Sequence, residues 1–251
     1  MIHYHGGPIT PETCARRAWK GRHAFVSWAH PEQIELAASV CQSFALDNGA
    51  FSFWRSGTPT DWPAYYDWCA RWLSHPACDW AVIPDVIEGT EDENDALLAE
   101  WPHGRHAKGV PVWHLNESPE RLERLARLYP RVALGSAAEW DVSRPRKCLQ
   151  RLAAVLPAIS DEAGTPLVKL HGLRMLAEEI ISRVPLASGD STNVARNIKY
   201  DQAWTGSYAP ATRETRVDVL IERIESVATP AVMANVVLPS DLTLWDQEDT
   251  A

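Results

Sequence analysis

Eight short apolar segments, each followed by a stretch with helical spacing, constrain the fold of this chain more than any other feature. Strands that are apolar on both faces are typical of a parallel sheet covered by helices. Eight strand–helix units within about 190 residues suit a compact (β/α)8 barrel. We therefore expect a single-domain α/β protein, a (β/α)8 TIM barrel. The expected strands are residues 1–5, 23–28, 43–46, 80–84, 110–114, 132–135, 167–171 and 186–190.

The expected barrel domain covers residues 1–227, and residues 228–251 form a C-terminal extension or tail. Glycine and proline predict a loop over residues 52–60, and apolar spacing predicts a helix over residues 173–181. Residues 210–227 predict a helix that closes the barrel. Its inward-facing residues are expected to be Val217, Leu220, Ile221 and Ile224.

The composition limits the classes of function. The chain has 33 acidic and 24 basic residues and a formal charge of −9, which argues against a non-specific nucleic-acid binder with a broad basic surface. It has no run of about 18 apolar residues, so we expect no membrane span. The first residues lack the regions of a signal peptide, which favours a cytoplasmic location. Five scattered cysteines without a CxxC pair argue against a disulfide framework or a zinc ribbon.

Five acids and histidines stand at the ends of five different expected strands. In a TIM barrel the carboxyl ends of the strands line one face, where active sites lie. One polar residue at a strand end is usually a helix cap or a turn former. Five such residues on separate strands are harder to explain as caps, and they predict one shared pocket. The residues are Asp47, Asp85, His114, His171 and Asp190.

Three carboxylates in one pocket indicate a chemistry. Crowded acids repel one another, so at least one is expected to keep its proton near neutral pH. The resulting nucleophile-and-acid pair suits displacement at an anomeric carbon. One carboxylate attacks C1′, and the other protonates the leaving group and later deprotonates the incoming one.

The segment Asp47-Asn48-Gly49-Ala50-Phe51 resembles the Asp-Ser-Gly-Gly-Tyr/Phe motif of the tRNA-guanine transglycosylase family. The resemblance implies that Asp47 is the general acid/base and that Phe51 stacks on a purine. Gly189-Asp190-Ser191 resembles the family segment that carries the nucleophile, which implies a covalent intermediate on Asp190. Asn48 belongs to the first motif and is expected to contact substrate.

Other segments continue the resemblance in the same order over residues 43–196. Asp85 resembles the base-reading aspartate, and Ala133-Leu134-Gly135-Ser136 resembles a turn whose backbone contacts the base. Trp113-His114-Leu115-Asn116 stands where the family has Val-Gln-Gly-Gly, so His114 replaces a glutamine that hydrogen-bonds the base. Leu170-His171-Gly172 stands at the family's Leu-Met-Gly. His114 and His171 are therefore expected to bind substrate, and Asn193 and Arg196 to meet a phosphate.

The chain lacks the family's zinc motif, Cys-x-Cys-x2-Cys with a later His, so no metal or cofactor is expected. It is most similar to short members of the family from phages and bacterial genome islands. That likeness implies exchange or cleavage of a guanine or 7-deazaguanine-type base, with DNA favoured over tRNA. The expected partners are nucleic acid and a purine or 7-deazapurine base. The oligomeric state stays open, a homodimer included.

Two other functions compete with this prediction. His3, His5, His114, His171 and Asp190 also resemble the ligands of amidohydrolase-type metal-dependent hydrolases, in which a metal-bound water is the nucleophile. A non-catalytic barrel would keep the same pocket to bind a nucleobase without turning it over.

Overall fold

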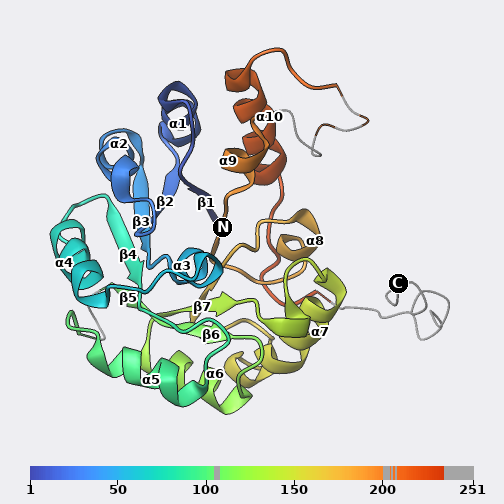
Figure 1. Cartoon of the computed structure of the whole chain (residues 1–251). Coiled ribbons are helices and arrows are strands. Elements are labelled where there is room, and N and C mark those ends of the chain that lie inside the picture. Colours follow the sequence, from blue (N-terminus) through green and yellow to red (C-terminus); the bar gives the residue numbers. More distant parts are fainter. Residues whose placement is uncertain (105–107, 200–203, 205, 207, 235–251) are drawn as a thin grey trace.

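The computed structural model describes residues 1–104, 108–199, 204, 206 and 208–234. Its strands form one parallel sheet in the order β5-β4-β3-β2-β1-β9-β8-β7-β6. Figure 1 shows the strands around a common centre, with most helices outside this ring. The strands are β1 (Ile2–Gly6), β2 (His23–Ser27), β3 (Ser43–Asp47), β4 (Cys78–Val82), β5 (Gly109–Val110), β6 (Val112–His114), β7 (Arg131–Gly135), β8 (Lys169–Gly172) and β9 (Ser188–Ser191).

The sheet closes into a barrel through Pro111. β5 and β6 end the strand order and are consecutive in the chain, with Pro111 alone between them. On one side of this point, Ile83 N–H donates to the Val110 carbonyl (2.9 Å). On the other, Ala133 N–H donates to the Pro111 carbonyl (2.9 Å). Residues 109–114 therefore act as one strand that joins β4 to β7, and the predicted TIM barrel is confirmed.

The helices lie between the strands, as the barrel requires. They are α1 (Glu12–Trp19), α2 (Ile34–Val40), α3 (Ala50–Ser56), α4 (Trp62–Trp72), α5 (Glu91–Glu100), α6 (Pro119–Leu128), α7 (Pro145–Val155), α8 (Glu178–Ile181), α9 (Asn193–Asn197) and α10 (Arg213–Glu225). The expected closing helix is α10, and its four predicted inward-facing residues are all buried. Of the predicted C-terminal extension, residues 228–234 are described and residues 235–251 lie outside the described ranges.

Two local predictions were wrong. Residues 50–56 form the helix α3, which overlaps the first part of the predicted loop, because Asn48 accepts the Ala50 N–H (2.8 Å) and Gly49 takes a left-handed conformation. The helix predicted over residues 173–181 is reduced to α8. Arg174 interrupts it, since its φ of 61° is left-handed and incompatible with a right-handed helix.

Side-chain alternation separates two apolar regions. One lies inside the barrel and includes Tyr4, Phe25, Trp80 and Val112. The other, larger region lies between the strands and the surrounding helices. Because successive residues of a strand point to opposite faces, the residue two positions after an interior side chain points inward again, nearer the rim. This alternation decides which polar residues at strand ends reach the barrel mouth.

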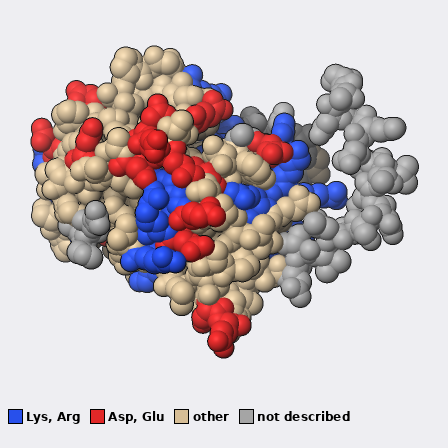
Figure 2. All heavy atoms as spheres, turned by 90° about the horizontal axis from the view of Figure 1, so that it is seen from below, with Lys and Arg blue, Asp and Glu red and all other residues tan. Residues whose placement is uncertain are grey.

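The outer face over α5 and α6 carries mixed charge. Figure 2 shows acidic and basic side chains close together on the face seen from below. Arg124 pairs with Asp95, and Arg127 pairs with Glu123. Exposed pairs of this kind contribute little to stability. No helix among the described residues is long and apolar enough to cross a bilayer.

The two glycines that flank α3 allow a matched test. Gly49 (φ 75°) and Gly57 (φ 67°) are both left-handed. A Cβ at Gly49 would lie 2.9 Å from the backbone nitrogen of Ala29, whereas a Cβ at Gly57 would meet nothing within 4 Å. Gly57→Ala should therefore destabilise the fold by about 1 kcal/mol through backbone strain alone. Gly49→Ala should destabilise it by at least about 2 kcal/mol more, measured by urea unfolding. Equal losses would contradict the close approach of Gly49 to Ala29.

Candidate functional site

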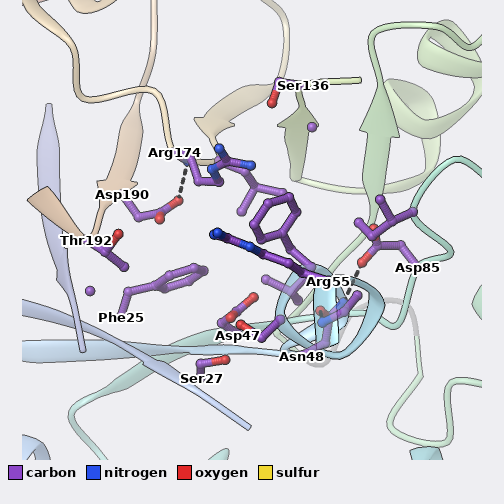
Figure 3. Close-up of a pocket in the computed structure, with 18 of the residues that line it drawn as sticks. Phe25, Ser27, Asp47, Asn48, Arg55, Asp85, Ser136, Arg174, Asp190 and Thr192 are labelled. Carbon is purple, nitrogen blue, oxygen red and sulfur yellow. Dashed lines mark hydrogen bonds between the residues drawn. The ribbon is translucent and has the colours of Figure 1, made fainter. Parts of the chain in front are cut away.

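A cavity of about 350 Å³ opens at the carboxyl ends of the strands. Of the ten residues predicted for the site, all but His171 and Asn193 line it. Figure 3 shows carboxylates on opposite sides, with Asp190 on one side and Asp85 on the other. Four of the five strand-end residues therefore lie around one cavity, namely Asp47, Asp85, His114 and Asp190. The predicted residues that line the cavity are Asp47, Asn48, Phe51, Asp85, His114, Gly135, Asp190 and Arg196.

His171 lies one layer below the cavity. It is fully buried, and its ring packs 4.7 Å from the ring of Trp80 inside the barrel. Its Nε2 lies 3.3 Å from Asp190 Oδ1. His171 therefore contacts the predicted nucleophile from beneath and is not a cavity-lining residue. It precedes Gly172, the last residue of β8, and so falls in the layer below the rim.

Asn193 begins α9 and lines a smaller hollow beside the cavity. Its backbone N–H donates to Ser191 Oγ (3.0 Å). Arg174, Thr192 and Arg196 line both the hollow and the main cavity. The hollow is therefore a side branch of the same site, and Arg196 is the predicted phosphate contact that reaches the cavity.

Asp47 has a strongly raised pKa. Part of its surface faces the cavity, but protein surrounds the carboxyl group. This burial raises the pKa of Asp47 to about 7; hydrogen bonds from Ser27 and Gly49 oppose the shift, and the charges of Asp190 and Asp85 add to it. Near neutral pH, Asp47 can therefore both donate and accept a proton, as general acid/base chemistry needs.

Asp190 is held by two donors on one oxygen. Its Oδ1 accepts the backbone N–H of Arg174 (3.0 Å) and lies 3.3 Å from His171 Nε2. Its Oδ2 makes neither contact. The side chain is 6% exposed, and this small accessible part faces the cavity that Asp190 lines. Asp190 is therefore an oriented carboxyl group with one oxygen left for another partner.

Asp85 and His114 form a buried ion pair at the opposite side of the cavity. His114 Nε2 lies 2.9 Å from Asp85 Oδ2, and Asn48 Nδ2 donates to Asp85 Oδ1 (2.6 Å). Burial lowers the pKa of His114, but the hydrogen bonds and charges of Asp85 and Glu117 outweigh it and raise this pKa to about 9. His114 is therefore an imidazolium at neutral pH and compensates the charge of Asp85.

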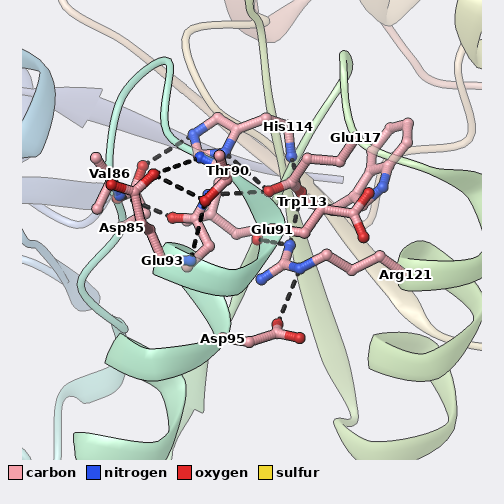
Figure 4. A network of polar contacts seen from close by, with 12 residues as sticks. Asp85, Val86, Thr90, Glu91, Glu93, Asp95, Trp113, His114, Glu117 and Arg121 are labelled. Carbon is pink, nitrogen blue, oxygen red and sulfur yellow. Dashed lines mark hydrogen bonds and ion pairs between the residues drawn. The ribbon is translucent and has the colours of Figure 1, made fainter.

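A second layer of charges supports this ion pair (Figure 4). Glu117 Oε2 accepts the backbone N–H of His114 (2.8 Å) and a hydrogen bond from Arg121 Nη1 (2.6 Å). Glu117 Oε1 accepts from Asn94 Nδ2 (2.9 Å). Glu117 and Arg121 are almost fully buried. Because every buried charge here has an opposite charge or hydrogen-bond partner, the network can hold His114 rigidly.

The sequence did not reveal two arginines of the cavity, Arg55 and Arg174. The Arg174 guanidinium lies 4.2 Å from the centre of the Phe51 ring, a cation–π contact. Arg55 stands one helical turn after Phe51, and Figure 3 shows its side chain in the space between Asp190 and Asp85. Because most of α3 was predicted as a loop, the sequence did not show that Phe51 and Arg55 are i, i+4 neighbours on a helix. Over the described ranges, neither these two arginines nor Arg196 forms an ion pair with a carboxylate.

His3 and His5 do not join the cavity. They alternate along β1 with Tyr4, which points into the barrel, so they point outward. His5 Nε2 contacts Glu225 Oε1 of α10 (2.9 Å). His3 and His5 are therefore not brought together with the other ligands expected for a metal-dependent hydrolase, which are His114, His171 and Asp190. Among the described residues, no group of three or more His, Cys, Asp or Glu is arranged to hold a metal ion.

Comparisons with known proteins assign no family to this chain. No protein-family model matches it, and neither does any curated protein or solved structure. The likeness to tRNA-guanine transglycosylases therefore depends on its short motifs and on the chemistry of the residues that carry them.

Asp47 should make the stability of the fold depend on pH. Its folded pKa of about 7 lies above the ordinary 3.8, so the folded protein keeps a proton that the unfolded chain releases. The stabilisation that this retained proton gives the folded protein is complete below about pH 4, and it is lost as the pH rises through 7. Asp47→Asn should abolish that loss and stabilise the protein at pH 8 by up to about 4 kcal/mol, with no gain at pH 4. Urea unfolding at both pH values measures this, and an equal effect at pH 4 and pH 8 would contradict the raised pKa.

Proposed function

We propose that this chain is a transglycosylase-like enzyme. It cleaves or exchanges a guanine or 7-deazaguanine-type base at an N-glycosidic bond of nucleic acid, with DNA favoured over tRNA. The observation that carries the proposal is one cavity holding two carboxyl groups in different surroundings. Asp47 has a pKa of about 7, and Asp190 receives hydrogen bonds on a single oxygen. One group suits proton transfer and the other suits nucleophilic attack.

The reaction takes two displacement steps. Asp190 Oδ2 attacks C1′ as the bond from C1′ to the base nitrogen breaks, and the electron pair goes to the base. The proton of Asp47 passes to the departing base, which leaves a glycosyl ester on Asp190. Asp47, now a carboxylate, then removes a proton from an incoming base or a water molecule. That molecule attacks C1′ and releases the Asp190 carboxylate.

The opposite side of the cavity suits recognition of a guanine-type base. The Asp85 carboxylate can accept hydrogen bonds from the N–H groups of guanine, which lie on one edge of the ring. Gly135 leaves room for the His114 ring, because a Cβ there would lie 2.8 Å from His114 Cδ2. Phe51 offers an aromatic face, already covered on one side by Arg174. These features favour a planar base with hydrogen-bond donors on one edge.

The arginines of the cavity favour a substrate that carries phosphate. Arg55, Arg174 and Arg196 line a single cavity without carboxylate partners in the described ranges, although the chain has 33 acidic residues. Guanidinium groups bind phosphate oxygens through paired hydrogen bonds. The net charge of −9 does not favour docking of a large folded RNA, so we place the target nucleotide in a short stretch of DNA.

Base exchange tests the proposal directly. The protein is incubated with single-stranded or duplex DNA, or with tRNA, and with radiolabelled guanine or a 7-deazaguanine, and label in the polymer is counted. Asp190→Asn should lower incorporation by more than about 1,000-fold, since it removes the nucleophile. Asp47→Asn should lower it by about 100- to 10,000-fold, since it removes the acid/base.

Asp67→Asn, on the exposed face of α4, is the matched control and should keep full activity. Full activity in Asp190→Asn would contradict the proposed nucleophile. If the wild type binds guanine but neither exchanges nor releases a base, the cavity is a binding site without turnover and the proposal is wrong.

A further inference from the structure

A chain of hydrogen bonds crosses the barrel interior from Asp190 to Arg131. Arg131 Nη1 lies 2.6 Å from Ser188 Oγ, and Ser188 Oγ lies 2.9 Å from His171 Nδ1. His171 Nε2 lies 3.3 Å from Asp190 Oδ1. Ser188 and His171 are fully buried, so these side chains are satisfied by one another. The four residues come from three neighbouring strands, β7, β8 and β9.

We propose that Arg131, Ser188 and His171 form a positioning relay that fixes one neutral tautomer of His171 and thereby keeps Asp190 oriented. The role of Asp190 as nucleophile rests on the proposed function, whereas the state of His171 does not. Arg131, Ser188 and His171 touch no substrate and act through Asp190.

The direction of the relay follows from which groups can donate. A guanidinium only donates, so Ser188 Oγ accepts from Arg131. Ser188 has a single hydroxyl proton, and it donates this proton to His171 Nδ1. Nδ1 is then bare, and the ring proton is on Nε2, which donates to Asp190 Oδ1. That oxygen also accepts the Arg174 N–H, so both contacts hold the same carboxyl oxygen of Asp190 in place.

The surroundings of His171 favour the neutral ring. Burial lowers the pKa of His171, and the positive charge of Arg131 lowers it further, while Asp190 opposes both. The other neighbours are aromatic: Tyr4, Phe25 and Trp80. The Tyr4 hydroxyl donates to Asp79 and does not reach into the relay. Trp80 also lies beneath the Arg131 guanidinium (5.5 Å), which fixes the far end of the chain.

The relay separates the roles of the two catalytic carboxyl groups. Two donors orient Asp190 through one of its oxygens, whereas burial stabilises the protonated form of Asp47. With Oδ1 occupied, the Oδ2 atom of Asp190 is the one free to attack. Sequence alone did not indicate a role for Arg131 or Ser188. Both stand at the amino-terminal ends of their strands, whereas the strand-end pattern considers only the carboxyl-terminal ends.

Nitrogen NMR of the full chain labelled at histidine tests the relay without any substrate. The wild type should show His171 with a protonated Nε2 and a bare Nδ1 at pH 7 and also at pH 6.5, the ordinary histidine pKa. Arg131→Met removes the positive charge and frees Ser188 to accept, so part of the His171 rings should carry a proton on Nδ1 at pH 6.5. A protonated Nδ1 in the wild type at pH 7 would overturn the relay, whatever the activity.

Enzyme kinetics give a second, separate test. Ser188→Ala should lower kcat by about 10- to 100-fold at unchanged KM. It should also remove the hydroxyl that donates to His171 Nδ1, so nitrogen NMR should show a proton on Nδ1 in part of the rings. His171→Gln, whose amide can still donate to Asp190, should recover part of the rate.

Ser43→Ala is the matched control. Ser43 is a buried interior serine at the same end of the barrel, bonded to Asp79 and outside the relay. The substitution Ser43→Ala should lower stability and leave both the His171 tautomer and kcat unchanged. If Ser188→Ala behaves like Ser43→Ala, the relay is purely structural and the inference is wrong. If His171 has the expected tautomer but no base exchange occurs, the relay stands and the proposed function fails.

Discussion

The hydrogen-bonded register of the parallel strands is the constraint on which the site depends. In that register Ser27 stands beside Asp47, and His114 stands beside Gly135. The first pairing brings a hydroxyl to the carboxyl group of Asp47, and the second leaves the space that the His114 ring fills. A shift of one residue in any strand would turn these side chains out of the barrel. Closure through Pro111 fixes the register around the whole ring.

The register also explains what the sequence predicted well. Asp47, Asp85, His114 and Asp190 follow apolar strands directly, so alternation and strand ends alone place them at one rim. His171 stands one layer deeper, and a strand-end pattern does not resolve that difference. His3 and His5 have the same spacing as interior residues but the opposite phase to Tyr4. Arg55 and Arg174 depended on local conformations, a short helix and a left-handed residue, that no periodicity revealed.

The distribution of charge in the cavity gives each carboxyl group a different state. Asp85 is neutralised by the His114 imidazolium, which Glu117 and Arg121 support from behind. Among the described residues Asp47 forms no ion pair, and it retains its proton to about pH 7. Asp190 is stabilised by hydrogen bonds from a neutral histidine and a backbone amide. Three acids can therefore share one cavity without mutual repulsion forcing them all to be neutral, and each is suited to a separate task.

The proposed function requires a covalent bond between Asp190 and C1′ of the substrate sugar. The most direct measurement is mass spectrometry of the wild-type protein, quenched in acid during reaction with an oligonucleotide and mapped by peptide. A glycosyl ester on Asp190 predicts a peptide that contains Asp190 and whose mass has increased by that of the base-free nucleotide fragment. Base exchange with the adduct on another residue, or with no adduct under conditions that trap esters, would contradict it.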